Sequence, residues 1–246
     1  MDLYSFCYLG DTNAKFEKLA LLSNEKWSFG DKTDNSILKN YLAYTFIKLY
    51  NENKVVDKQN YFVFNTGLFT EYYEPIYAYG PQNAIPNQQP WYLERFCTGY
   101  DLGTLGVSER PLRANYFEDP SLLVFDAKCP INVQYKHILE DDENVKRFPS
   151  CLQGSKMLCT LLNGAVDMMT KKVMANYKVA VPQYFDNKIQ LLLPLCLENP
   201  DKADVALVVT KNTEGSFYQG HTCLTMEMAY NNARLIAKPD SNWLIP

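Results

Sequence analysis

Two apolar runs near the C-terminal end carry the clearest pattern in the chain. Residues Tyr177–Phe185 and Lys188–Leu197 are rich in β-branched, aromatic and leucine residues, and only Asp186 and Asn187 separate them. Asp and Asn tolerate positive φ angles, so these two residues suit a tight hairpin turn. The pattern therefore predicts a β-hairpin. Both of its faces are largely apolar, so we expect both to be covered.

The predicted turn also fixes which residues lie opposite each other. A two-residue turn pairs Gln183 with Gln190 and places two amides on an otherwise apolar surface. They either bond to each other, which is the simpler interpretation, or belong to a site. Pro182 and Pro194 cannot donate ladder hydrogen bonds, so we expect them at edges or bulges.

Helical periodicity appears in three further parts of the chain. Apolar residues between Ile37 and Leu49 form one arc of a helix that starts after Asp34 or Asn35, and such a helix packs on a sheet or another helix. Residues Ser155–Met174 predict the longest helix, with one wide apolar face.

The third helical stretch, Met226–Lys238, is apolar apart from one narrow polar stripe. The stripe residues recur at spacings of four, three and four, and they are Glu227, Asn231, Arg234 and Lys238. At 3.6 residues per turn they share one side of the helix, so the stripe lies either at the surface or along a cleft. Asn232 falls outside the stripe. We expect it to bond a backbone segment, because a buried amide needs partners.

An alternating stretch, Ile131–Leu139, predicts a strand that carries one of the two histidines of the chain, His137. On an apolar strand face, His137 is most simply a core residue bonded to a backbone carbonyl. The alternative is a histidine in a cleft, able to act as an acid or a base.

Taken together, these patterns predict an α+β fold. We expect a single compact domain over residues 1–246, with a helical N-terminal part (1–55) and a sheet-containing core (56–246). The core would hold a mixed or antiparallel sheet, one long packing helix and a C-terminal closing helix. At 246 residues and 47% hydrophobic composition the chain can bury a substantial core.

Charge and cysteine content narrow the classes of function. A net charge of −4 argues against a broad basic nucleic-acid-binding face, although a local basic cleft remains possible. The seven cysteines are scattered and show no C-x-x-C pair, which favours reduced thiols in a cytoplasmic protein. The first residues lack a signal-peptide pattern, and no run predicts a membrane span. We expect no metal site, no cofactor and no membrane partner. The sequence does not determine the oligomeric state.

Common catalytic motifs are absent. The chain has no Gly-x-Ser-x-Gly elbow, no His-Glu-x-x-His, no deaminase pattern and no P-loop. His221-Thr222 is similar to half of a two-histidine phosphoesterase motif. Because its hydroxyl falls one residue early and no second copy exists, we set it aside.

Several short motifs, in order, resemble a bacterial domain-of-unknown-function family from about Leu19 to the C-terminus. They are Phe64-Asn65-Thr66-Gly67-Leu68, His137-Ile138, Arg147-Phe148-Pro149, Asn176-Tyr177-Lys178, Val181-Pro182-Gln183-Tyr184, Ile189-Gln190-Leu191-Leu192-Leu193-Pro194-Leu195 and Ala229-Tyr230-Asn231-Asn232-Ala233-Arg234-Leu235. Some members of that family carry cold-shock or LOTUS-type RNA-binding domains ahead of this one. The resemblance implies a setting that involves RNA or nucleotides, and it supplies no reaction.

Polar residues within these motifs form the candidate site. His137 is the candidate catalytic residue. The candidate ligand-binding residues are Asn65, Arg147, Lys178, Gln183, Tyr184, Asn231 and Arg234. Two arginines and a lysine near amides and a tyrosine suit a phosphate together with a base or ribose.

The leading hypothesis is a domain that binds a nucleotide-like ligand or an RNA end and processes its phosphate by metal-independent acid/base chemistry. The alternatives are a non-catalytic RNA-binding or regulatory module and a purely structural interaction domain. Convergence of Arg147, Lys178 and Arg234 in one cleft would favour the first. Basic residues spread over an open aromatic face would favour the second, and polar stripes that face solvent separately would favour the third.

Overall fold

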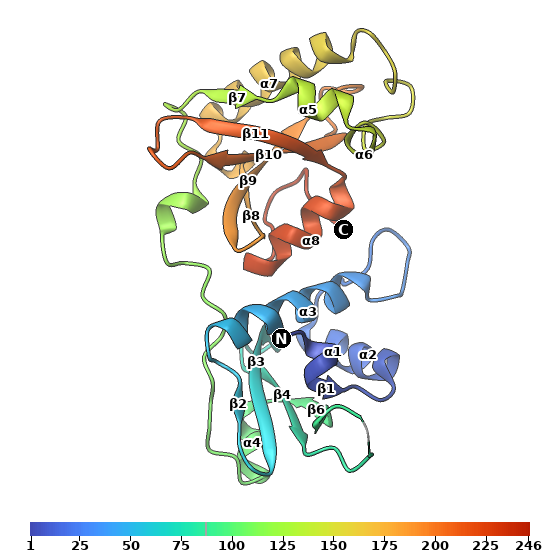
Figure 1. Ribbon diagram of the computed structural model, residues 1–246, viewed down its shortest axis with the longest axis vertical. Helices are drawn as coiled ribbons and strands as arrows, with labels where there is room; N and C mark the ends of the chain where they lie inside the picture. The colour runs from blue at the N-terminus through green and yellow to red at the C-terminus, as the bar shows by residue number, and fades with distance from the viewer. Residues whose placement is uncertain (87) are drawn as a thin grey trace. The chain divides into compact units, whose positions relative to one another are not determined.

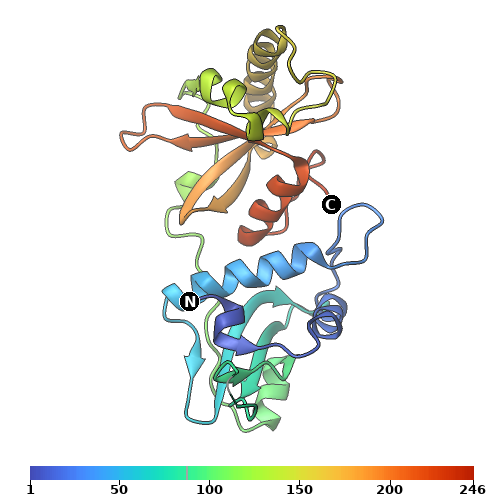
Figure 2. The same ribbon diagram turned by 45° about the vertical axis from the view of Figure 1, so that its right-hand side comes forward.

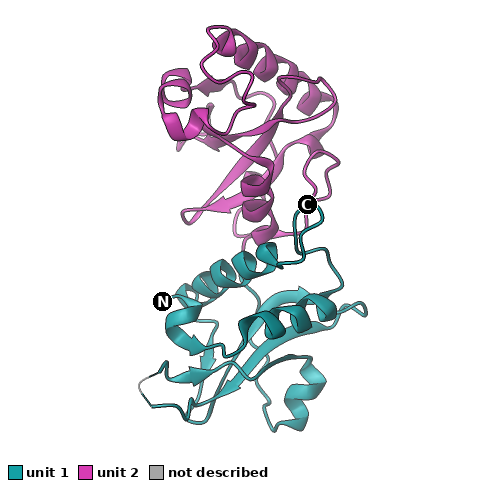
Figure 3. Cartoon of the chain, turned by 90° about the vertical axis from the view of Figure 1, so that its right-hand side faces the viewer, with its two compact units in different colours: residues 1–115, 246 teal, residues 116–245 magenta. Residues whose placement is uncertain are grey.

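The computed structural model describes residues 1–86 and 88–246, and the chain forms two compact units. The first unit comprises residues 1–115 with 246, and the second comprises residues 116–245 (Figure 3). The predicted α+β class is confirmed, with separate sheets in the two units where the sequence suggested one. A single domain over residues 1–246 stays a prediction. The boundary between the units follows residue 115 and does not coincide with the predicted transition after residue 55.

The first unit is built on a four-stranded antiparallel sheet in the order β2-β3-β4-β6 (Figure 1). Its strands are β2 (Val56–Asp57), β3 (Tyr61–Phe69), β4 (Pro75–Pro81) and β6 (Arg95–Cys97). Its helices are α1 (Leu3–Phe6), α2 (Thr12–Ser23), α3 (Ser36–Asn51) and α4 (Gly99–Thr104). A short parallel pair joins β1 (Cys7–Tyr8) to β5 (Trp91–Tyr92).

Aromatic side chains form the core between α3 and β3. The ring of Phe46 on α3 lies 5.1 Å from the ring of Phe64 on β3, and the ring of Phe6 lies 5.3 Å from that of Phe62. All four side chains are buried, and aromatic pairs of this kind contribute about 0.5–1.5 kcal/mol each beyond the area they bury. The apolar arc of α3 was predicted to pack on a sheet or another helix, and it packs on β3 of the sheet.

The second unit is built on a five-stranded mixed sheet in the order β7-β11-β10-β9-β8. Its strands are β7 (Ile131–Val133), β8 (Val181–Phe185), β9 (Lys188–Leu195), β10 (Val205–Lys211) and β11 (Tyr218–Leu224). Its helices are α5 (Tyr135–Glu140), α6 (Asp142–Val145), α7 (Leu158–Ala175) and α8 (Met226–Ile236), with 3₁₀ turns η1 (Pro120–Leu123) and η2 (Tyr177–Val179).

The predicted hairpin is confirmed as β8 and β9. Asp186 and Asn187 form its turn with φ angles of 48° and 58°, which is the left-handed backbone that a two-residue turn requires. The register pairs Phe185 with Lys188 and Gln183 with Gln190, as predicted. The first strand begins later than expected, since Tyr177–Val179 form a 3₁₀ turn.

Helices cover both faces of this sheet (Figures 1 and 2). α7 packs on one face against alternate leucines of β9, including Leu191 and Leu193, which belong to the same buried cluster as Leu162 and Met169 of the helix. α8 packs on the other face, mainly against β8. The expectation that both faces are covered is therefore confirmed, and both predicted helices exist with slightly shifted ends.

The predicted strand Ile131–Leu139 is wrong beyond its third residue. β7 ends at Val133, the backbone N–H of Gln134 donates to the carbonyl of Gly220, and the chain then turns into α5. Helical periodicity places Ile138 in the core and leaves His137 exposed. The interpretation of His137 as a core residue on a strand face is wrong for the same reason.

No helix within the described residues is long and apolar enough to cross a membrane.

The left-handed backbone of the hairpin turn can be tested by substitution at Asn187. Asn187→Gly should stabilise the second unit by up to about 1 kcal/mol, because glycine adopts positive φ without a Cβ penalty. Asn187→Val should destabilise it by about 1–2 kcal/mol, since a β-branched residue is strained there. Urea unfolding followed by circular dichroism measures both changes. Similar free energies of unfolding for both variants would contradict the left-handed turn.

Candidate functional site

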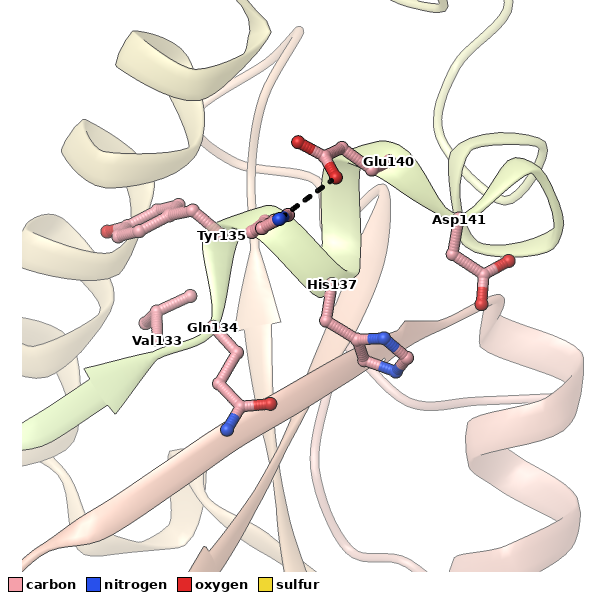
Figure 4. Close-up of a pocket in the computed structure, with 7 residues that line it drawn as sticks. Val133, Gln134, Tyr135, His137, Glu140 and Asp141 are labelled. Atoms are coloured by element: carbon pink, nitrogen blue, oxygen red, sulfur yellow. Dashed lines mark ion pairs between the residues drawn. The ribbon is translucent and has the colours of Figure 1, made fainter.

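The two histidines of the chain lie on contacting elements of the second unit, α5 and β11. His137 is exposed on α5, and His221 is half-buried on β11. The charge of His137 lowers the pKa of His221. In Figure 4 the imidazole of His137 points away from α5 and lies over the neighbouring strand.

His221 occupies an irregular position in its strand. Val208 pairs with Thr222 and Val209 pairs with Gly220, so His221 is an extra residue in β11. Such a β-bulge bends the strand and re-aims a side chain, and bulges are enriched next to active sites.

The surroundings of His221 also change its acid–base behaviour. Burial is the largest influence and lowers the pKa of the imidazole, and the positive charges of His137 and Lys188 lower it further. His221 is therefore neutral above its ordinary pKa of 6.5, and a neutral imidazole can accept a proton.

A shallow depression of about 710 Å³ opens beside His137 (Figure 4). It is lined by Val133, Gln134, Tyr135, Lys136, His137, Glu140 and Asp141. Lys136 and Glu140 form an ion pair of 3.9 Å on its rim, and both are largely exposed. The side chains of Gln134 and His137 extend to the same side of α5. His137 therefore lies at a surface depression, and its role as an acid or a base stays a prediction.

Arg147 joins α6 to β11 directly after the bulge. Its Nη1 donates to Asn144 Oδ1 at 2.9 Å, to Thr222 Oγ1 at 2.9 Å and to the carbonyl of Cys223 at 2.8 Å. Thr222 also donates to Asn144, whose side chain is 3% exposed. These bonds hold the residue that follows His221, so Arg147 positions the bulge. A ligand-binding role for its guanidinium stays a prediction.

Gln183 belongs to a chain of side-chain hydrogen bonds. Asn232 Nδ2 donates to Gln183 Oε1 at 3.2 Å, and Gln183 Nε2 donates to Gln190 Oε1 at 2.8 Å. Gln190 Nε2 then donates to Thr210 Oγ1 at 3.0 Å. The interpretation of Gln183 and Gln190 as a bonded pair is confirmed. Asn232 bonds a side chain, so the expectation of a backbone partner is wrong.

Lys178 and Tyr184 lie near the edge of the sheet formed by β8. Lys178 is exposed, and its Nζ lies 3.7 Å from Asp240 Oδ2. The hydroxyl of Tyr184 donates to Asn187 Oδ1 at 3.2 Å, and its ring centroid lies 4.9 Å from that of Tyr116. These contacts connect segments of the second unit, and ligand binding by either residue stays a prediction.

The polar stripe of α8 is uneven. Glu227 and Lys238 are exposed, whereas Arg234 is 5% exposed. Asn231 is half-buried, and its Oδ1 has no hydrogen-bond partner within the described part of the chain. The stripe is not a uniform surface, and one of its residues, Lys238, lines a depression of about 240 Å³ that Lys178 also lines. The anion-binding role of Asn231 and Arg234 stays a prediction.

Asn65 lies in the first unit, whereas the other candidate residues lie in the second. Its Oδ1 accepts from the backbone N–H of Gly67 at 2.9 Å, and its Nδ2 donates to the carbonyl of Pro111 at 3.2 Å. Gly67 has a φ of 78°, so the Asn65 side chain stabilises a left-handed bend in β3. Its role in ligand binding stays a prediction.

The sequence did not predict that the two histidines lie on contacting elements. His221-Thr222 was set aside as half of a motif, and no local pattern connects it with His137. β7 pairs with β11 in parallel, and this long-range contact places α5 beside His221. The available signal was that both histidines of the chain stand in short motifs, His137-Ile138 and His221-Thr222.

Cysteines and metal ligands contribute little to the site. All seven cysteines are free, and burial raises the pKa of Cys7 and of Cys223 to about 12, which keeps both thiols protonated. Among the described residues no group of three or more His, Cys, Asp or Glu side chains could hold a metal ion.

A family model described as Domain of unknown function (DUF3825) matches residues 19–243. No curated protein and no solved structure matches the chain. The matched range agrees with the region over which the sequence motifs resemble a domain-of-unknown-function family, so that part of the resemblance is confirmed.

The interaction between the histidines can be measured directly. His137→Gln should raise the pKa of His221, because a positive charge beside it is removed, but burial should still hold that pKa below 6.5. A titration of imidazole resonances by NMR measures this, and the variant leaves a single histidine to follow. Lys171→Gln, an exposed change on α7, is the control. A pKa of His221 that is unchanged in His137→Gln would contradict the interaction.

Arg147 should matter for stability. Arg147→Lys keeps the charge and loses the planar donor group that bonds three acceptors, so the free energy of unfolding should fall by about 1–3 kcal/mol. The neighbouring Lys146→Met removes an exposed ion pair with Glu143 and should change it by less than about 1 kcal/mol. Urea unfolding compares the two, and equal effects would show that the Arg147 bonds contribute no more than a surface pair.

Proposed function

The chain belongs to the family described as Domain of unknown function (DUF3825), and for this member we propose a metal-independent phosphodiester-processing function. The substrate is a nucleotide-like ligand or an RNA end. It binds on the second unit at the surface between α5 and β11. One observation carries this proposal: α5, which bears the exposed His137 at a surface depression, contacts β11, where His221 occupies a β-bulge.

Two imidazoles in different protonation states can cleave RNA without a metal ion. The 2′-hydroxyl oxygen attacks the adjacent phosphorus and gives its proton to the base, and the bond from phosphorus to the 5′-oxygen breaks. The acid protonates that 5′-oxygen, which leaves a 2′,3′-cyclic phosphate and a 5′-hydroxyl. Positioned general acids and bases contribute about 10²- to 10⁴-fold each.

The structure supports a division of roles between the two rings. His221 has a lowered pKa and is half-buried, so its neutral form is favoured and we assign it as the base. His137 is exposed, so its imidazole can reach the 5′-oxygen of a bound substrate, and we assign it as the acid. The charge of His137 also lowers the pKa of His221, which favours the neutral form of the base.

The cations near the histidines can receive the phosphate. Lys188 is exposed and close enough to influence His221, and Lys136 lines the depression. Arg147 contributes through the Thr222 contact that holds the bulge. In a second arrangement for the same ligand class, Arg147, Lys178 and Arg234 bind the phosphate.

Two further features are consistent with this setting. The sequence motifs resemble a family in which some members also carry cold-shock or LOTUS-type RNA-binding domains. The seven free cysteines suit a reducing compartment, and we place the protein in the cytoplasm. No cofactor enters the proposed chemistry.

A cleavage assay tests the proposal. The full chain is incubated with a single-stranded RNA of mixed sequence carrying a 5′ fluorophore, and products are separated on a denaturing gel. We expect products that end in a 2′,3′-cyclic phosphate, and the same rate in EDTA. His137→Ala and His221→Ala should each reduce the rate by about 10²- to 10⁴-fold. Lys171→Gln is the matched control on α7.

The outcomes separate the candidate functions. Cleavage that EDTA abolishes and a divalent cation restores would overturn the metal-independent mechanism. Binding of the RNA without cleavage would favour the alternative, a non-catalytic RNA-binding or regulatory module. Neither binding nor cleavage would favour a structural interaction domain.

A further inference from the structure

A single row of polar side chains crosses the five-stranded sheet of the second unit. The strand registers pair Gln183 with Gln190, Thr210 with Gln219, and Gln219 with Asn132. The hydrogen bond from Gln190 to Thr210 closes the remaining step. Every strand therefore contributes one amide or hydroxyl to the row.

The row lies on the α8 face of the sheet. Asn232 of α8 bonds Gln183, and directly opposed strand residues project from the same face. The intervening leucines, such as Leu191, face α7. Exposure increases along the row, from Gln183 at 1% through the half-buried Gln190, Thr210 and Gln219 to the exposed Asn132.

The buried half of the row has a single direction. Asn232, Gln183 and Gln190 each donate to the next residue, and Thr210 Oγ1 accepts the last bond. The proton of the Thr210 hydroxyl is then left to donate elsewhere. Consecutive hydrogen bonds polarise one another, so this hydroxyl is held in place and strengthened as a donor.

The open half of the row has unused hydrogen-bonding groups. Among the described residues, the side-chain amides of Gln219 and Asn132 make no hydrogen bond. They lie opposite each other, next to Thr210 on the adjacent strand. Gln219 is also two residues before His221 in β11. A hydroxyl donor and two amides thus form the open end of the row, on the strand that carries His221 and on its two neighbouring strands.

We propose that Thr210, Gln219 and Asn132 bind the edge of a nucleobase in the ligand whose phosphate lies at the histidines. This inference rests on the proposed function and names the part of the substrate that the same site recognises. Side-chain amides offer a donor and an acceptor together, and they pair in a bidentate manner with bases that present the complementary groups. A ribose–phosphate backbone without a base offers no such edge.

Charge supports a base over an anion at this end of the site. Asn132, Gln219 and Thr210 are all uncharged, and the cations assigned to the phosphate, Lys188 and Lys136, lie elsewhere in β9 and α5. The separation of neutral amides from charged groups matches a nucleotide, which has a neutral base joined to a charged phosphate.

The test uses 2′-O-methyl RNA hexamers, which lack the attacking hydroxyl and so cannot be cleaved by the proposed route. Fluorescence anisotropy compares oligo-A, oligo-U and oligo-C with an abasic hexamer of the same backbone. We expect the full chain to bind at least one base-containing hexamer on the order of 10- to 100-fold more tightly than the abasic one. Gln219→Leu and Thr210→Val should each remove most of that preference.

The controls distinguish recognition from folding. Thr213→Val makes the same chemical change at an exposed turn position and should keep the preference. Gln219→Leu leaves the bonded relay from Asn232 intact, so it separates the open amide from the buried network. Equal binding of all hexamers, the abasic one included, would overturn the inference even if unmodified RNA is cleaved. A base preference that depends on Gln219, without cleavage of unmodified RNA, would support it and refute the proposed catalysis.

Discussion

The register of the β8–β9 hairpin is the constraint on which the second unit depends. Side chains in a strand alternate between the two faces, so a shift by one residue would send Gln183 and Gln190 into the leucine cluster under α7. The left-handed backbone of Asp186 and Asn187 prevents that shift, because it closes the turn with two residues. Given this register, Asn232 of α8 can meet Gln183, and the amides continue across the sheet. One short turn thereby determines which side of the sheet carries the polar row.

The neighbourhood of the histidines depends on long-range contacts. β7 is only three residues long, yet its parallel pairing with β11 brings α5 alongside the bulge. Arg147 then connects α6 with Thr222 and Cys223, so both short helices are attached to the same strand. His137 and His221 therefore lie on two elements that are distant in sequence, and these bonds hold the two elements together.

The sequence allowed accurate prediction wherever the determining interactions are local. The turn chemistry of Asp186 and Asn187 gave the hairpin and its pairs, and the 3.6-residue period gave α3, α7 and α8. It failed where a distant partner decides the structure. Ile131–Leu139 alternates as a strand would, but β11 pairs with only its first three residues and the remainder becomes α5. The partner of Asn232, the nearness of the two histidines and the placement of Asn65 in a different unit also depend on tertiary contacts.

The proline of β8 has a consequence for association between molecules. β8 is the outer strand of the sheet. Because the tight turn closes at the Phe185–Lys188 pair, the odd-numbered residues of β8 form the hydrogen-bonded pairs with β9. The backbone groups of Pro182 and Tyr184 therefore point outward. Pro182 has no N–H group to offer there, which removes a donor that an incoming strand would need. At the opposite edge, β7 is too short to template a partner. The sheet is therefore terminated at both ends, and strand addition that could lead to aggregation is disfavoured by the same sequence that builds the hairpin.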